Sequence, residues 1–233
     1  MKAQRLRFRY RVALEASVLS QRELVGAWEN AAKAAGLPLA YSEGKRPAAQ
    51  ISVAAPLPLN VTSDSERVDV FFGERVDPGE ARALITPQLP PGIELMAAEE
   101  VGVGGPSLQS QLRWAEYEVE VPAGSVSAEG LRRAIADLLR ADTLPSEYRR
   151  ESKVRLYDLR PLILDLRLQE RRDDALVLCM RLRAEPEMTG RADQVLLALG
   201  IAQAGRIHRR RLYLEEAQAA VLAYRRLGEP EEG

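Results

Sequence analysis

One stretch of the sequence, residues 36–59, fixes where a helix must stop and where a strand can begin. Gly36 suits the position just after a helix end, and Pro38 prevents the helix from continuing because proline has no backbone N–H. A turn follows through Gly44-Lys45-Arg46-Pro47, and an apolar strand begins near Ile51. A chain with a helix, a turn and a strand in this order must combine helices with a sheet.

Upstream of this stretch, residues 5–14 alternate between apolar and basic side chains, which is the period of a strand buried on one face. The apolar face is expected to enter the core. Two interpretations of the basic face stand side by side: a sheet face with acidic partners on neighbouring strands, or a surface that binds phosphate or an acidic partner. The basic face carries Arg5, Arg7, Arg9 and Arg11.

Helix and strand signals in the first part of the chain follow one another as strand, helix, strand, strand, helix, strand. Ser20 and Glu23 have the spacing of a capping box, and the helix they open carries Trp28 on its apolar stripe, which predicts a core position. Asp77 followed by Pro78 predicts the start of the second helix. The strands are predicted at residues 5–14, 50–55, 67–72 and 93–101, with a polar turn at 60–65.

The same order returns after residues 101–106, a glycine-rich run that is typical of a linker. A helix is predicted after Ser127, and Cys179 is predicted to be a small buried hydrophobe within a strand. The remaining strands are predicted at 115–121, 148–157, 162–168, 175–184 and 207–214, and the remaining helices at 191–199 and 215–227.

The repeated order predicts an α+β fold made of two tandem ferredoxin-like (βαββαβ) units, with antiparallel sheets and helices on one face. The first unit is predicted at residues 1–104, and the second, which includes the C-terminal helix, at residues 105–233. A chain of 233 residues has the length for two such units.

The composition excludes several kinds of chemistry. The chain has one cysteine and one histidine, so it cannot assemble a Cys/His zinc site or supply the thiolates of an iron–sulfur cluster, and no cofactor is expected. The net charge of −1 gives no sign of nucleic-acid binding from bulk charge. No run is long and apolar enough to span a bilayer and no secretory leader is recognisable, which predicts a cytoplasmic protein without a membrane partner.

The stretch that begins at Gly36 also carries a family resemblance. Its order is Leu-Pro-Leu-Ala-Tyr-Ser, then Gly and Pro, then Ile-Ser and Pro-Leu-Pro-Leu, and further matches are Glu116-Tyr117, Asp-Leu-Arg-Pro-Leu-Ile at 158–163, and Arg211-Leu-Tyr213. Together these motifs resemble the radical SAM-linked family, a bacterial domain of unknown function found beside, or fused to, radical SAM proteins with a cobalamin-binding-type domain. The resemblance covers residues from about 5 to about 213 and implies a radical SAM protein as partner, with the radical chemistry in that partner.

The chain departs from the family pattern in two places, which marks it as a divergent member. Where the family shows Ser-His-Leu-Asp-Leu, this chain has Ser-Gln-Arg-Glu-Leu at 20–24. Where the family shows Gly-Phe-x-Pro-x-Pro, this chain has Gly-Lys-Arg-Pro-Ala-Ala at 44–49. An activity of the family that depends on that histidine or phenylalanine is expected to be lost or altered here.

Clustered basic residues are the strongest functional signal. The planar fork of arginine suits phosphate, whereas the low aromatic content of 5% argues against a base-stacking platform. Gly44 is predicted to allow the turn that aims a side chain of Arg46-Pro47 into a basic cleft between the two units. The residues predicted to bind RNA or another anionic substrate there are Lys45, Arg46, Arg150, Lys153, Arg160, Arg209 and Arg211, with Gly44 and Pro47 shaping the loop.

These features predict a non-catalytic accessory protein for a radical SAM enzyme. The sequence leaves two alternatives open: a metal-independent RNA-processing or RNA-modifying enzyme on the same fold, and a protein-interaction module that binds no nucleic acid. His208 is the one histidine and the candidate acid or base for the enzyme alternative. Its basic neighbours at 206–211 instead favour a histidine that is either satisfied within the protein or exposed at the surface.

Overall fold

The computed structural model describes residues 2–122, 124, 126–150, 153–170 and 176–215, and for residues 148–150, 153, 155 and 170 it describes the backbone only. The chain forms two compact units. Unit 1 comprises the residues up to 59, residues 65–113 and those from 213 onward, and unit 2 comprises residues 60–64 and 114–212. The predicted linker at 101–106 therefore lies within unit 1, and the chain passes into unit 2 at Trp114.

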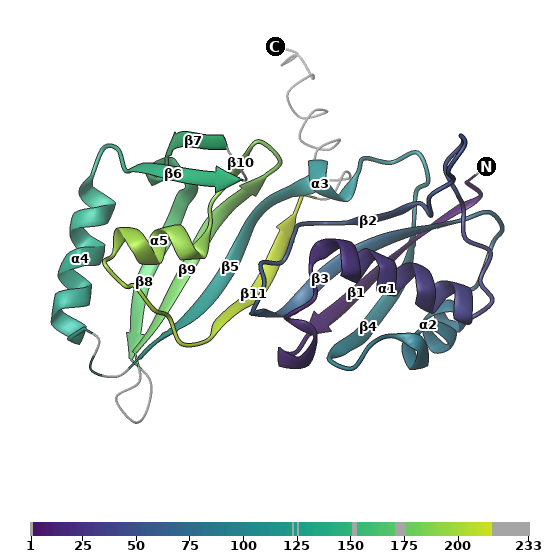
Figure 1. Ribbon diagram of the computed structural model, residues 1–233, viewed down its shortest axis with the longest axis horizontal. Helices are drawn as coiled ribbons and strands as arrows, with labels where there is room; N and C mark the ends of the chain where they lie inside the picture. Colours follow the sequence, from purple (N-terminus) through teal and green to yellow (C-terminus); the bar gives the residue numbers. More distant parts are fainter. Residues whose placement is uncertain (1, 123, 125, 151–152, 171–175, 216–233) are drawn as a thin grey trace, which may run out of the picture. The chain divides into compact units, whose positions relative to one another are not determined.

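Unit 1 alternates strands and helices in the predicted order, and α1 lies in front of its strands in Figure 1. The strands are arranged as β4–β1–β3–β2, with β1 antiparallel to β4 and β2 antiparallel to β3. The elements are β1 (Gln4–Val12), α1 (Gln21–Ala34), β2 (Ile51–Val53), β3 (Val61–Phe72), α2 (Pro78–Ile85), β4 (Ile93–Val101) and α3 (Leu108–Gln111).

The predicted helix starts in unit 1 are confirmed by their caps. The backbone N–H of Glu23 donates to the Ser20 hydroxyl, and the Glu23 carboxylate accepts from the Ser20 backbone N–H, which completes a capping box. Hydrogen bonds from the side chain and the backbone of Ser20 lower the pKa of Glu23. Asp77 accepts from the backbone N–H of Glu80 and so caps α2, with Pro78 at the first helical position.

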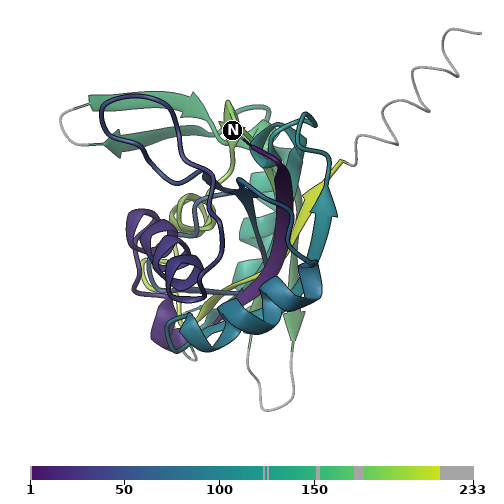
Figure 2. The same ribbon diagram turned by 90° about the vertical axis from the view of Figure 1, so that its right-hand side faces the viewer.

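The core of unit 1 forms around Trp28, which is fully buried as predicted. The centre of its ring system lies 5.4 Å from the ring of Phe8 and 5.2 Å from the ring of Tyr10. Figure 2 shows β1, which supplies both of these aromatic residues, with α1 and α2 beside it. The alternation predicted for the first strand is confirmed by its buried residues, Leu6, Phe8, Tyr10 and Val12.

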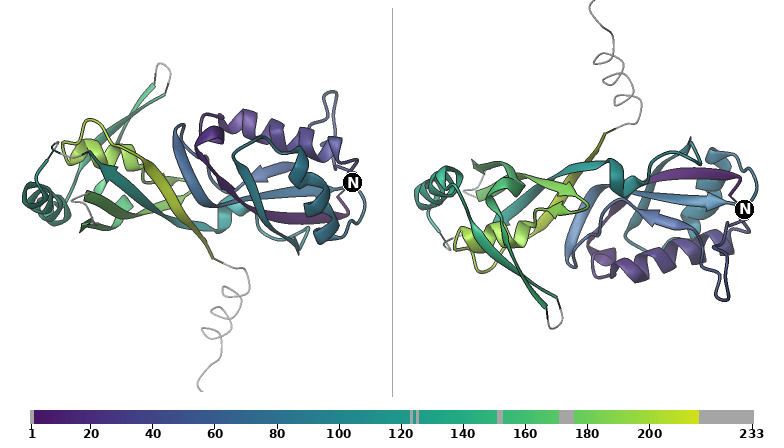
Figure 3. Two further views of the ribbon diagram at one scale, coloured as in Figure 1. Left: turned by 90° about the horizontal axis from the view of Figure 1, so that it is seen from below. Right: turned by 90° about the horizontal axis from the view of Figure 1, so that it is seen from above.

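Unit 2 also combines strands with helices, and two of its strands, β6 and β7, are inserted after its first helix. Its strands are arranged as β8–β9–β5–β11, with β9 antiparallel to both β5 and β8. The inserted strands β6 and β7 form a separate hairpin, which extends away from the other elements of unit 2 in both views of Figure 3. The elements are β5 (Leu112–Val121), α4 (Ala128–Arg140), β6 (Pro145–Arg150), β7 (Lys153–Asp158), β8 (Ile163–Glu170), β9 (Leu176–Glu185), β10 (Met188–Thr189), α5 (Ala192–Ala198) and β11 (Ile207–Leu214).

Two predicted segments differ from the structure, the first through pairing with a distant strand and the second through a local hairpin. Residues 60–65 are predicted as a polar turn, but β3 begins at Val61, and Val61 to Ser63 pair in parallel with β11. This pairing outweighs the weak strand propensity of the polar side chains. Residues 148–157, predicted as one strand, instead turn back on themselves as the β6–β7 hairpin, in which Arg150 pairs with Lys153.

Cys179 is half-buried rather than a buried hydrophobe, and its Sγ lies 3.4 Å from Oε1 of Gln169. Glu118 stands opposite it on β5, whose outward positions are polar. The helix predicted at 215–227 falls outside the described residues from 216 onward. The α+β class with mostly antiparallel strands is confirmed. Within the described part of the chain, no helix is long and apolar enough to cross a membrane.

Candidate functional site

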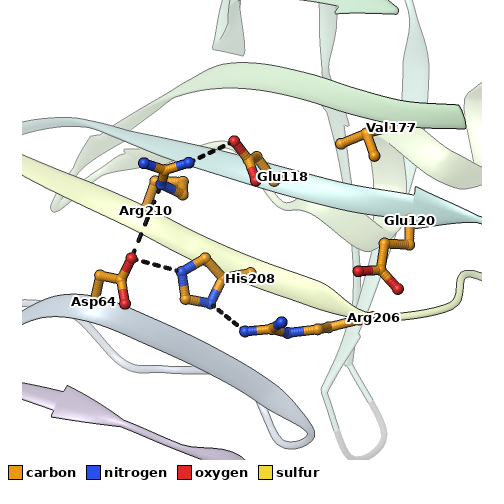
Figure 4. A pocket seen from close by; sticks show the side chains of 7 residues that line it. All are labelled: Asp64, Glu118, Glu120, Val177, Arg206, His208 and Arg210. Atoms are coloured by element: carbon orange, nitrogen blue, oxygen red, sulfur yellow. Dashed lines mark hydrogen bonds and ion pairs between the residues drawn. The ribbon is translucent and has the colours of Figure 1, made fainter. Parts of the chain in front are cut away.

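A pocket of about 180 Å³ lies on the outward face of the strands of unit 2. Figure 4 shows that its lining side chains rise from β5, β11 and the beginning of β3, with β9 at one side. On β5 these side chains alternate with buried apolar residues, so the strand period places them on one face. The pocket is lined by Asp64, Glu118, Glu120, Val177, Arg206, His208 and Arg210.

His208 contacts other side chains through both nitrogens of its ring. Nε2 lies 3.1 Å from Oδ2 of Asp64, and Nδ1 lies 2.8 Å from the Thr62 hydroxyl and 3.4 Å from Nη2 of Arg206. Because a guanidinium can only donate, Nδ1 acts as the acceptor and the proton of the neutral ring is assigned to Nε2, which donates to Asp64. The ring therefore has its tautomer and its orientation fixed by the protein.

Thr62 links His208 to Arg206. The hydroxyl of Thr62 accepts from Nε of Arg206 at 3.3 Å and donates its own hydrogen to the imidazole. Thr62 is buried, and it stands opposite His208 in the parallel register of β3 and β11. The backbone pairing of these two strands thus sets the position of the guanidinium.

Arg210 pairs with carboxylates on the two strands that flank β11. Its Nη1 lies 2.7 Å from Oε1 of Glu118, and its Nε lies 3.9 Å from Oδ2 of Asp64. A similar pair stands between β9 and β5, where Arg181 lies 3.0 Å from Glu116. These pairs are partly exposed, so each contributes about 1 kcal/mol or less, and their main effect is to balance the charge of this face.

In unit 1, the predicted binding residues Lys45 and Arg46 lie at the exposed tip of the turn between α1 and β2. The turn is closed at its base by hydrogen bonds between Ser42 and Ala48. Gly44 has a φ of 124°, a conformation that is costly for residues with a side chain. Figure 2 shows this segment of unit 1 projecting as a long loop.

In unit 2, Arg160 and its motif at 158–163 make contacts within the unit. The guanidinium of Arg160 donates to the carbonyl oxygens of Leu139 and Ile163, at 3.0 and 3.1 Å. The carboxylate of Asp158 accepts from the backbone N–H groups of Leu144 and Arg160 itself. This motif therefore fastens the base of the β6–β7 hairpin to the end of α4.

The other predicted residues of unit 2 have different surroundings. On β11, Arg209 is buried and Arg211 is exposed. Arg150 and Lys153 pair at the end of the hairpin, and their side chains lie outside what the structure describes. A basic cleft shared by the two units stays a prediction.

Sequence reasoning missed the pocket in unit 2, although one signal was present. Arg206, His208 and Arg210 stand at alternate positions, so the strand period alone places them on one face. Of the two predicted alternatives, His208 is the satisfied histidine rather than the exposed one, since both ring nitrogens have partners and only 12% of its side chain is accessible. Within the described ranges, no three histidine, cysteine, aspartate or glutamate side chains gather as a possible metal site.

Comparison with known proteins gives one family match. A family described as "Uncharacterized protein conserved in bacteria (DUF2344)" matches residues 5–192. The comparison with curated proteins gives no match. Among solved structures, a chain of the "Crystal Structure of a Cbf5-Nop10-Gar1 Complex" is similar at a TM-score of 0.49 and 14% identity, over 90% of this chain. This chain spans 50% of the length of that one.

Proposed function

The chain belongs to DUF2344, a family of uncharacterized proteins conserved in bacteria, and we propose that it is a non-catalytic accessory protein that binds RNA or another anionic substrate for a radical SAM enzyme. The motifs at 36–59 and 158–163, which resemble the radical SAM-linked family, support the choice of partner. The non-catalytic role is supported by His208, because both of its ring nitrogens are bonded within the protein rather than directed at a substrate.

We also infer that both units are ferredoxin-like. In each unit the fourth strand of the βαββαβ order lies beside the first, the first beside the third and the third beside the second. This is the arrangement expected of a split βαβ fold. In that fold the third strand lies between the first and the second, and the first strand lies between the third and the fourth. In unit 2 the β6–β7 hairpin is an insertion into that order.

The observation that carries the anion-binding role is the difference between paired and unpaired cations. Lys45 and Arg46 contact no carboxylate in the part of the chain that the structure describes, and they project at the tip of a turn. Arg7 and Arg210, on sheet faces, lie 2.8 and 2.7 Å from carboxylate oxygens. A phosphate can bind an unpaired cation without displacing a carboxylate, so we place the first anion contacts at Lys45 and Arg46.

A fluorescence titration with labelled single-stranded RNA at two salt concentrations tests this proposal. Each phosphate contact adds about −0.7 to the slope of log affinity against log salt for a single strand. The Lys45→Glu/Arg46→Glu variant should bind more weakly and with a shallower slope. The loss should be the same for different RNA sequences, because phosphates carry no base information.

The matched control is Arg133→Glu/Arg140→Glu on α4. Both arginines are exposed, and both already pair with an acid on their own helix, Glu129 and Asp137. This control makes the same change in net charge and should bind RNA as the wild type does. Equal weakening by the two double variants, or a wild type that binds without salt dependence, contradicts a contact at the turn.

A second candidate, a protein-interaction module, is favoured by the charge balance on the outward face of unit 2. Arg181 and Arg210 are each matched by a glutamate of β5, Glu116 and Glu118 respectively. A neutral mosaic of both signs suits a protein surface with the complementary pattern better than it suits a polyanion. Co-purification with a radical SAM protein that Glu116→Lys/Glu118→Lys abolishes, together with no RNA binding, would favour this candidate.

A further inference from the structure

Two opposite charges that line the pocket of unit 2 have no partner within the described residues. Glu120 is exposed, and its carboxylate makes no hydrogen bond or ion pair with another described side chain. Arg206 contacts Thr62 and His208 but no described carboxylate. The two residues are neighbours on adjacent segments, because the backbone N–H of Glu120 donates to the carbonyl oxygen of Arg206 at 2.9 Å.

The guanidinium of Arg206 makes its described side-chain hydrogen bonds with groups other than Glu120. Its Nε is bound to the buried Thr62 hydroxyl, and its Nη2 faces Nδ1 of His208. A guanidinium carries five N–H donors, so several remain directed elsewhere. Glu118, the other acid on this part of β5, is already taken by Arg210 at 2.7 Å. The pocket thus presents one positioned cation and one separate anion.

The size of the pocket limits what fits within it. Its volume of about 180 Å³ corresponds to roughly six water molecules at about 30 Å³ each. Pockets for drug-sized ligands begin at about 300 Å³, so this pocket suits a smaller ligand. Val177 lines the pocket from β9 but is itself buried, so it offers an occupant almost no apolar surface.

We propose that this pocket binds a small zwitterion, namely a free α-amino acid. Arg206 binds the carboxylate, for which its planar fork is suited, and Glu120 binds the ammonium group. This site needs neither RNA nor a radical SAM partner, so it goes beyond the accessory role proposed above.

Ligands with a single charge fit the pocket less well. A phosphate or another anion that reaches Arg206 also meets the carboxylates of Asp64, Glu118 and Glu120. A simple cation that reaches Glu120 meets Arg206 and Arg210. Only a ligand that carries both charges satisfies the unpaired cation and the unpaired anion together.

Isothermal titration with three related probes tests the proposal on the full chain without RNA. The probes are leucine, N-acetyl-leucine, which lacks the ammonium group, and leucinamide, which lacks the carboxylate. Leucine should bind at least tenfold more tightly than either blocked probe. Equal binding of all three probes, or no binding of leucine, overturns the proposal. An absence of leucine binding is also what a direct Arg206–Glu120 ion pair in solution would give.

Two variants assign each charge to its half of the ligand. Glu120→Gln should lose the preference for leucine over N-acetyl-leucine and keep the preference over leucinamide. Arg206→Gln should show the reverse, and Arg206→Lys should recover part of the affinity for leucine because it restores the charge without the fork. Glu187→Gln, which removes an exposed glutamate outside the pocket, is the control and should bind all three probes as the wild type does.

Thermal unfolding of each variant shows whether it is folded before binding is compared. Glu120 is exposed, so its replacement should leave the melting temperature unchanged. Variants that fold normally but retain the full preference of the wild type would overturn the assignment of the two charges. Failure of the RNA titration leaves these results untouched, because none of the probes or variants is shared with it.

Discussion

Two rows of basic residues at alternate positions, one on β1 of unit 1 and one on β11 of unit 2, have opposite surroundings. On β1, Arg5 and Arg7 converge on the fully buried carboxylate of Asp69, with Nε of Arg5 at 2.7 Å and Nε of Arg7 at 2.8 Å. The second row, Arg206, His208 and Arg210, starts one residue before β11 and lines an open pocket. A period of two thus identifies a strand, but the neighbouring strand decides whether its arginines are structural or available.

The difference lies in what covers each row. Above β1, the remaining donors of Arg5 reach the carbonyl oxygens of Gly102, Gly105 and Pro106. Burying a charge is tolerable only when its partners are complete, and the glycine-rich run at 101–106 completes them. That run, predicted as a linker, is therefore a cover for unit 1. Nothing comparable covers the pocket of unit 2 among the described residues.

The largest effect is expected from Asp69→Asn, which leaves two largely buried arginines without their carboxylate. Removing one partner of a buried ion pair costs about 3–5 kcal/mol, so this variant should lose that much free energy of unfolding. Urea denaturation followed by circular dichroism measures it. Asp64→Asn removes the corresponding acid of the open row, whose side chain is 45% exposed, and should cost about 1 kcal/mol or less. Equal losses would erase the distinction between the two rows.

A smaller effect is expected from Arg5→Lys, which keeps the charge but loses the fork that spans Asp69 and the covering carbonyls. Hydrogen bonds to charged groups contribute about 1.5–3 kcal/mol each, and the lysine can replace only some of them. The loss should appear as faster amide hydrogen exchange at residues 102–105 together with a lower free energy of unfolding. Unchanged exchange in that segment would mean that Arg5 does not hold the cover in place.

The same comparison shows how far the sequence could predict this structure. Helix starts depend on contacts three residues apart, so Ser20 with Glu23, and Asp77 with Glu80, were predictable. The segment that covers Arg5, and the start of β3, depend on contacts with residues far away in the chain. His208 and Thr62, for example, are 146 positions apart. Such pairs cannot be identified from local patterns, because strand pairing alone brings them together.

Site prediction failed in the same way. The exposed turn around Lys45 and Arg46 was predictable, since Gly44 and Pro47 are local turn signals. The pocket was not, because Asp64 and Thr62 lie in a segment whose polar residues favour a turn. Counting arginines also could not distinguish Arg160, which binds two carbonyl groups, from an arginine available to a ligand.

The Arg210–Glu118 pair of the open row should contribute little to stability. A double-mutant cycle with Arg210→Gln and Glu118→Gln should give a coupling energy of about 0.2–1 kcal/mol, as expected for a pair that is partly in water. The coupling should shrink further as salt is added. A coupling of several kcal/mol would mean that this row is as structural as the row on β1.

The smallest effect is expected at Arg11, the last member of the β1 row, and it separates the effect of the strand from the effect of the cover. Arg11 lies on the same strand and face as Arg5, but its partner is Glu94 at 3.5 Å, with the two side chains 46% and 65% exposed. Arg11→Gln should change the free energy of unfolding by about 0.5 kcal/mol or less, because an exposed pair is screened by water. The loss of free energy could instead approach that of Arg5→Lys in the same urea experiment. In that case a position in the row, rather than burial against Asp69, would determine how much an arginine contributes to stability. The arginines of the open row would then also be expected to stabilise unit 2.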